Sequence, residues 1–156
     1  MDYQSEQAVW RRVKAGGSVS AEEALLPERL EALILQERAD AASLRRLARR
    51  MGGRGSAAVT RAAASAESRA RRLLTLHYLL SGRQLRLQTP PCPKQGTPLE
   101  ALREASLRME QTAKAYEALA EEFPERSRLF AELGCQSRGQ YRALATQLQA
   151  LLCDRI

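Results

Sequence analysis

Four stretches of this sequence carry apolar residues spaced alternately by three and four positions, and this spacing most restricts the fold. A repeat near 3.5 residues aligns such side chains in a seam along a helix, and these seams pack in bundles that cross at about 20°. The seams cover residues 30–51, 63–77, 102–123 and 130–151. We therefore predict an all-α fold, an antiparallel four-helix bundle.

The predicted helix ends follow from capping residues and from helix-breaking residues. Ser20 with Glu23 is a capping box for the first helix, which stops at Gly52 and Gly53. Ser56 is the expected cap of the second helix, which ends near Gly82. We predict a bundle over residues 27–153, preceded by an arm or short helix over residues 1–26.

The strongest helix signal begins the third helix. Thr97 is its expected N-cap, Pro98 is suited to the first helical position, and Glu100 completes a capping box. This helix should stop near Phe123, because Pro124 disfavours a helical conformation at the residue before it. The fourth helix follows at once and reaches about Cys153.

The link between the second and third helices, RQLRLQTPPCPKQG, is far longer than a hairpin turn. Its roughly fourteen residues reach over about 40 Å, the length of a helix of about 27 residues. The two other links are only a few residues long, so helices one and two, and helices three and four, should form antiparallel hairpins. A crossover of this length lets the second and third helices run parallel.

Charge and hydropathy narrow the classes of partner. About twelve arginines lie between Arg38 and Arg86 against only Asp40 and Glu67, so this first hairpin could attract nucleic acid or an acidic protein partner. The stretch has no recognition motif and few aromatic residues, so the hypothesis that it binds nucleic acid is the weaker one. No apolar run approaches the roughly 18 residues that span a bilayer, and MDYQSEQ is not a secretory signal. We expect a cytoplasmic protein without membrane contact.

Two carboxylates occupy positions that the seams reserve for apolar residues. Glu37 and Glu67 both lie on a seam near the middle of a helix. A buried carboxylate is costly without a cation or hydrogen-bonding partners. Di-iron bundles contain such residues, since one Glu from each of two helices and a Glu-x-x-His from each of the other two bind their metals.

The chain resembles the rubrerythrin-like branch of the ferritin-like superfamily over roughly residues 30–152. The resemblance rests on LQERADAASLRRLA, AESRARRLLTLHYLLSG, MEQTAKAYEALA and LFAELGCQSRGQYRAL, in this order and spacing. It implies a ferritin-like bundle with a long crossover between helices two and three, and a di-iron centre with oxidoreductase activity.

The ligand pattern that the resemblance implies is incomplete in this chain. Glu37 and Glu67 match two of its carboxylates. The other positions hold residues that bind iron poorly: Ala70, Met109, Ser137 and Gln140. We therefore expect Glu37 and Glu67 to be remnants of a degenerate metal site, satisfied by Ser137, Gln140 or water, with no catalytic residue and no cofactor.

Three functions remain open from the sequence. The first is a non-catalytic binding or interaction module. The second is a metal-binding oxidoreductase with a rearranged iron or manganese site at Glu37 and Glu67. The third is a basic adaptor for nucleic acid or an acidic partner. The arm contains Val9, Trp10 and Val13, which could cover the bundle end or a neighbouring subunit, so a homodimer is also open.

Four further residues carry structural expectations. His77, the only histidine, should be packed or at a rim, and the Tyr116 hydroxyl should be hydrogen-bonded in the core. Gly134 and Gly139 lie inside the fourth helix, where they would allow a close helix approach.

Overall fold

The computed structural model describes residues 21–88, 91 and 93–154, and these residues form four long helices with no strand. The elements are α2 (Ala21–Arg50), α3 (Gly53–Ser81), α4 (Pro98–Glu122), the 3₁₀ helix η1 (Pro124–Arg126) and α5 (Ser127–Cys153). The prediction of an all-α bundle is confirmed. None of the helices in this part of the chain is long and apolar enough to cross a bilayer.

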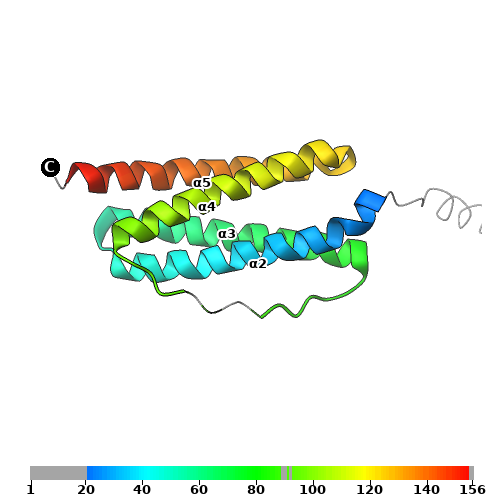
Figure 1. Cartoon of the computed structure of the whole chain (residues 1–156), viewed down its shortest axis with the longest axis horizontal. Helices are drawn as coiled ribbons and strands as arrows, with labels where there is room; N and C mark the ends of the chain where they lie inside the picture. Colours follow the sequence, from blue (N-terminus) through cyan, green and yellow to red (C-terminus); the bar gives the residue numbers. More distant parts are fainter. Residues whose placement is uncertain (1–20, 89–90, 92, 155–156) are drawn as a thin grey trace, which may run out of the picture.

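The helices lie side by side along one long axis (Figure 1). As drawn, α2 runs from right to left and α3 returns to the right, whereas α4 runs to the right and α5 returns to the left. In the described residues, α2 packs against α3 and α4, and α5 packs against α4 and α3. Consequently α3 and α4 stand at opposite corners of the bundle.

The segment between α3 and α4 passes along the outside of the bundle and returns the chain to the end where α3 began (Figure 1). Leu85 and Leu87 at its start pack against the core. Near its end, Gln95 Nε2 donates to the backbone oxygen of Ser43 at 2.8 Å, and Arg50 Nη2 donates to the backbone oxygen of Gly96 at 2.7 Å. The crossover is therefore attached at both ends.

The capping box at α4 is confirmed. Glu100 N donates to Thr97 Oγ1 at 3.2 Å, and Thr97 N donates to Glu100 Oε2 at 2.9 Å. The predicted end of α3 near Gly82 is confirmed, but the predicted cap at Ser56 is wrong, because the helix begins at Gly53 with Gly52 as its cap. Ser56 lies inside the first turn, where its hydroxyl donates to the backbone oxygen of Ala48 at 3.0 Å.

The first helix begins earlier than the predicted boundary between residues 26 and 27. Pro27 lies inside α2, which starts at Ala21. Leu26 is buried and packs in the same cluster as Leu30, so core contacts hold the turn before the proline although its missing N–H removes one helical bond. Residues 1–20 of the predicted arm over residues 1–26, which include the Ser20 cap, lie outside the described residues.

Two apolar clusters fill the bundle from its two ends. One contains Leu44, Leu47, Val59, Leu102 and Leu144 from all four long helices. The other contains Leu30, Ile34, Leu73, Leu119 and Phe130, again from all four. Polar side chains from the middle of the helices lie between these clusters, at the level where the sequence predicts a metal site.

Candidate functional site

Glu37 lies in the middle of α2 and is completely enclosed by the bundle. Its side chain is 1% exposed, which confirms its predicted seam position. A carboxylate at this depth needs partners for its charge and its oxygen atoms. Two residues on other helices supply them, Arg69 from α3 and Tyr116 from α4.

Arg69 forms a two-pronged ion pair with Glu37. Arg69 Nε donates to Glu37 Oε1 at 2.7 Å, and Arg69 Nη2 donates to Glu37 Oε2 at 3.0 Å. Arg69 Nη1 donates to Ser65 Oγ at 2.9 Å. The planar guanidinium matches a carboxylate edge to edge, which makes this type of ion pair strong and directional.

Tyr116 completes the shell of Glu37. Its hydroxyl donates to Glu37 Oε1 at 2.6 Å, which confirms the prediction of a buried, hydrogen-bonded phenol. Burial, followed by the nearby Glu37 charge, raises the pKa of Tyr116 well above its ordinary value. The phenol therefore stays protonated and acts as a donor. Three of the roughly four acceptor sites of Glu37 are occupied.

Arg69 fits in the core because its neighbours on α3 are small. Ala62, Ala66 and Ala70 are all buried and carry only a methyl group. Their small side chains leave room for the aliphatic stem of Arg69, and Arg69 as a whole is 0% exposed. We did not predict Arg69 as part of a site. The large residues Val59 and Leu73 lie on the same face of α3, and they could have indicated that this face points into the core.

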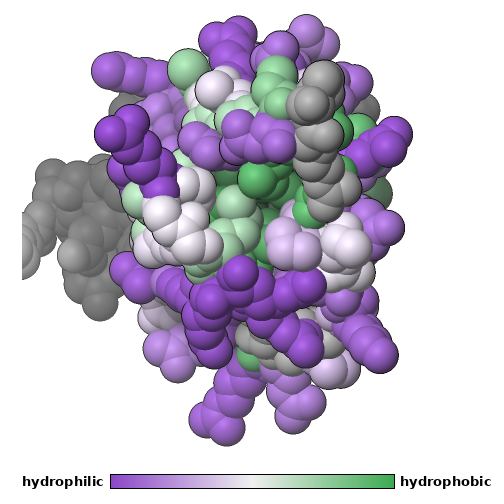
Figure 2. Space-filling model, turned by 90° about the vertical axis from the view of Figure 1, so that its left-hand side faces the viewer, coloured by the Kyte–Doolittle hydropathy of each residue, from purple (hydrophilic) through white to green (hydrophobic). Residues whose placement is uncertain are grey.

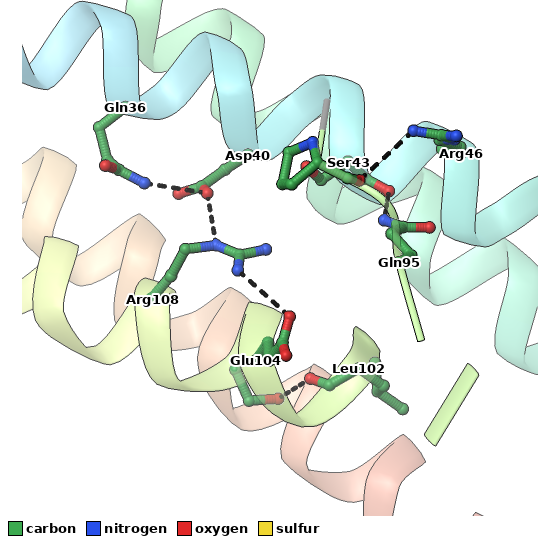
Figure 3. Close-up of polar contacts among 10 residues, drawn as sticks. Gln36, Asp40, Ser43, Arg46, Gln95, Leu102, Glu104 and Arg108 are labelled. Carbon is green, nitrogen blue, oxygen red and sulfur yellow. Dashed lines mark hydrogen bonds and ion pairs between the residues drawn. The ribbon is translucent and has the colours of Figure 1, made fainter. Parts of the chain in front are cut away.

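A second ion pair lies one helical turn from Glu37. Asp40 Oδ1 accepts from Arg108 Nε on α4 at 2.8 Å and from Gln36 Nε2 at 3.1 Å (Figure 3). Burial raises the pKa of Asp40 and outweighs the opposing effect of the Arg108 charge. We call the five residues Glu37, Asp40, Arg69, Arg108 and Tyr116 the polar layer. It contains two carboxylates and two guanidinium groups, so its formal charges balance.

The prediction that Glu67 lies on the seam beside Glu37 is wrong. Its side chain is 33% exposed and forms ion pairs with Arg45 and Arg71. The hydrogen bond from Arg45 Nη1, 2.6 Å from Glu67 Oε1, is the main cause of its lowered pKa. α3 is turned about its own axis relative to the predicted orientation. As a result Arg69, and not Glu67, faces Glu37.

The four positions that replace expected ligands take separate roles. Ala70 and Met109 are buried apolar residues, whereas Gln140 is only partly buried. Ser137 is fully buried, and its hydroxyl donates to the backbone oxygen of Met109 at 3.1 Å. The expectation that Ser137 or Gln140 satisfies Glu37 is therefore wrong, because Arg69 and Tyr116 do so.

His77 is packed, as predicted, and lies outside the polar layer. It is 2% exposed, with Nε2 at 3.1 Å from Glu31 Oε1 and Nδ1 at 3.2 Å from Ser81 Oγ. Ser81 Oγ also donates to the backbone oxygen of His77 at 2.7 Å. These contacts join α2 to the last turn of α3.

The two helical glycines in α5 differ. A Cβ at Gly134 would lie 3.2 Å from Tyr116 Cβ, so this glycine permits a close approach of α4. A Cβ at Gly139 would meet nothing within 4 Å, so the expectation of close packing is wrong there.

The residues of the polar layer do not form a metal-binding set. In the described part of the chain, no group of three or more His, Cys, Asp or Glu side chains could hold an ion. Each carboxylate of the polar layer already pairs with its own guanidinium. A metal at Glu37 would have to displace or repel Arg69.

Comparison of the chain with protein-family models, curated proteins and solved structures gives no match.

Proposed function

We propose that this chain is a ferritin-like bundle of the rubrerythrin-like type that acts as a non-catalytic interaction module. The observation that carries the proposal is the ion pair between Glu37 and Arg69. It puts the Arg69 guanidinium against Glu37, whose carboxylate is enclosed by the bundle. Such a centre supports the fold but has no free ligand for a redox metal.

The path of the chain supports the ferritin-like part of this proposal. Two hairpins with short links, α2 with α3 and α4 with α5, are joined by a crossover that runs along the bundle (Figure 1). Adjacent helices then run antiparallel, and the diagonal pair α3 and α4 runs parallel. This is the arrangement of ferritin-like folds, which carry one long crossover connection.

The alternative of a rearranged iron or manganese site has weaker support. That site needs Glu37 and Glu67 to share one ion, but Glu67 pairs with Arg45 and Arg71 at the surface. The third alternative, a basic adaptor, is favoured by the Arg-rich first hairpin and is compatible with an interaction module. A cytoplasmic location and a homodimer stay predictions.

Thermal melting with and without metals tests the loss of the metal site. A metal at 100 times its dissociation constant would stabilise the fold by about 2.7 kcal/mol, or roughly 5–10 °C in Tm. We expect the Tm of chelator-treated protein to change by less than about 1 °C on adding Fe(II) or Mn(II). Elemental analysis of protein purified without chelator should give no stoichiometric iron or manganese.

The Glu37→Gln variant provides the control for this experiment. It should melt at a lower temperature than the wild type by the same margin with and without metal. A large metal-dependent rise in the wild type that Glu37→Gln abolishes would contradict the proposal and support the rearranged site.

A further inference from the structure

The end of the bundle formed by the α2–α3 turn and the last turn of α5 exposes apolar side chains. Met51, Leu148 and Leu151 are partly buried against the adjacent core cluster, and Leu152 is 49% exposed. Figure 2 views this end and shows hydrophobic atoms at the centre with hydrophilic residues around them. We call these four residues the apolar floor.

Arginines from the first hairpin stand beside this floor. Between residues 41 and 66 the sequence contains six arginines and no Asp or Glu. Arg49, Arg50 and Arg54, at the turn itself, are exposed and form the basic rim. Among the described residues, Arg49 and Arg54 have no ion-pair partner, and Arg50 donates to the backbone oxygen of Gly96.

The helix ends at this end of the bundle carry both signs of partial charge, since α3 and α4 begin there and α2 and α5 end there. Gly52 caps α3 without a side-chain hydrogen bond, and the first turn of α3 contains no acidic residue. The partial positive charge of this helix end is therefore left to solvent. Two acidic residues lie at this end of the bundle although they are distant in sequence: Glu100, which is used in the capping box of α4, and Asp154 after α5.

We propose that this end binds an acidic amphipathic segment of a partner protein, with apolar side chains on the floor and carboxylates on the rim. The proposal rests on the proposed function, since it identifies the partner class of the interaction module. Neighbouring helix axes in a bundle lie about 8–10 Å apart, so the floor accepts only one or two large side chains. The interface is accordingly small, weak and salt-dependent.

The same features disfavour other occupants. A second copy of the chain docked symmetrically would place the rim arginines of both copies against each other. Nucleic acid would match the rim but leave the floor uncovered, and the floor offers no aromatic side chain for base stacking. An anionic bilayer would meet the arginines, but the floor residues are mostly recessed.

The test uses the full chain and a fluorescein-labelled helical peptide of about sixteen residues with Leu on one face and Glu elsewhere. Fluorescence anisotropy measures its affinity at low and at high salt. Peptides with Lys in place of Glu, or Ser in place of Leu, should bind at least about tenfold more weakly, because each lacks one half of the match.

Matched variants place the binding on this end. Arg49→Glu combined with Arg54→Glu should weaken binding at least about tenfold, as should Leu151→Ser on the floor. Arg86→Glu with Arg128→Glu makes the same change in net charge near the opposite end, and it should alter affinity less than about twofold. Circular dichroism and thermal melting establish that every variant is folded.

Three results would overturn the docking proposal. The first is that the two charge-reversal pairs weaken peptide binding equally. The second is that Leu151→Ser binds the peptide as tightly as the wild type. The third is that the wild type does not bind the peptide. Single-stranded DNA and phosphatidylserine vesicles serve as competing probes, and tight rim-dependent binding of either without peptide binding would also refute it. None of these results affects the thermal melting with metals or the elemental analysis. Failure of the docking proposal is therefore distinguishable from failure of the proposed function.

Discussion

Arg69 and Glu37 depend on each other because, among the described residues, the only charged group that each one hydrogen-bonds is the other. Each side chain is 1% exposed, so removing one leaves the other charge enclosed by the core. Breaking a buried ion pair from one side typically costs about 3–5 kcal/mol, whereas replacing both members with apolar residues can be neutral. The relevant pair for such an experiment is Glu37 with Arg69, and not Glu37 with Glu67.

We expect Arg69→Met to lower the free energy of unfolding by about 3–5 kcal/mol, measured by urea denaturation. The double variant Glu37→Leu with Arg69→Met should recover most of this loss, because no charge remains buried. Arg71→Met, at a side chain 78% exposed, is the control and should cost less than about 0.5 kcal/mol. A mild effect of Arg69→Met, or equal effects of the single and double changes, would show that the pair is not coupled.

Asp40 should make stability fall as the pH rises. Burial raises its pKa above the ordinary 3.8, so the folded state binds this proton more tightly than the unfolded state. Stability is therefore lost as the pH rises from 3.8 through the raised folded value. Asp40→Asn, which cannot ionise, should become more stable relative to wild type as the pH rises from 3.8 through the raised folded value.

Glu132 offers a control of opposite sign for the Asp40 experiment. The hydrogen bond from Arg72 lowers its pKa, so its contribution is present above the ordinary 4.5 and lost as the pH falls through the lowered folded value. The stability of Glu132→Gln relative to wild type should therefore rise as the pH falls. For each variant, the quantity compared is its free energy of unfolding minus that of the wild type. If this difference changed with pH in the same direction for both variants, the assignment of the Asp40 shift to burial would be contradicted.

At the level of single elements, α3 explains why the site was only partly predictable. Glu37 and Tyr116 were correctly assigned to the core, since large apolar residues define the seams of α2 and α4. In α3 the many alanines make two adjacent faces look equally apolar. Ala63, Ala70 and His77 of the predicted seam are buried, but the seam misplaces Glu67, whose side chain is 33% exposed. The large residues Val59 and Leu73, both 0% exposed, identify the true inward face, which also contains Arg69.

Arg69 was missed because a basic residue in an Arg-rich helix is normally solvated. A pattern of apolar residues cannot distinguish a solvated arginine from one that pairs with a carboxylate on another helix. That distinction depends on tertiary contacts between residues 32 positions apart. The second ion pair, between Asp40 and Arg108, joins residues 68 positions apart and escaped prediction for the same reason.

Two glycines, one that caps α3 and one inside α5, should respond oppositely to the same substitution. Gly82 ends α3 with a φ of 68°, a left-handed conformation that a Cβ disfavours, so Gly82→Ala should cost about 1 kcal/mol. Gly139 lies inside α5 with open space where an added methyl group would sit, so Gly139→Ala should add up to about 1 kcal/mol. Urea denaturation of both variants tests the signs, and destabilisation by Gly139→Ala would contradict the described packing.

At the level of the whole molecule, the crossover determines which topology the two hairpins can adopt. A helix of 25 residues such as α4 is about 37 Å long. The chain must cover a comparable distance between the end of α3 and the start of α4 (Figure 1). A shortened crossover could no longer span the bundle.

Deleting residues 88–95 should abolish cooperative melting or lower the Tm sharply. The remaining eight or so residues reach at most about 28 Å, and Leu85 and Leu87 are retained. Inserting eight Gly and Ser residues after Gln88 should cost less than about 1 kcal/mol, because loop-closure entropy grows slowly with length. The Gln95→Ala variant measures the separate loss of its bond to Ser43. A deletion variant that melts like wild type would indicate a different path of the chain.

The cation at the centre of the bundle is covalently part of the chain. Arg69 is made with the polypeptide, so every molecule carries one equivalent from synthesis, and dilution cannot remove it. A guanidinium also has no second accessible oxidation state. The charge that Arg69 contributes is therefore independent of iron supply, whereas a bundle that depends on bound iron would gain or lose its central charge.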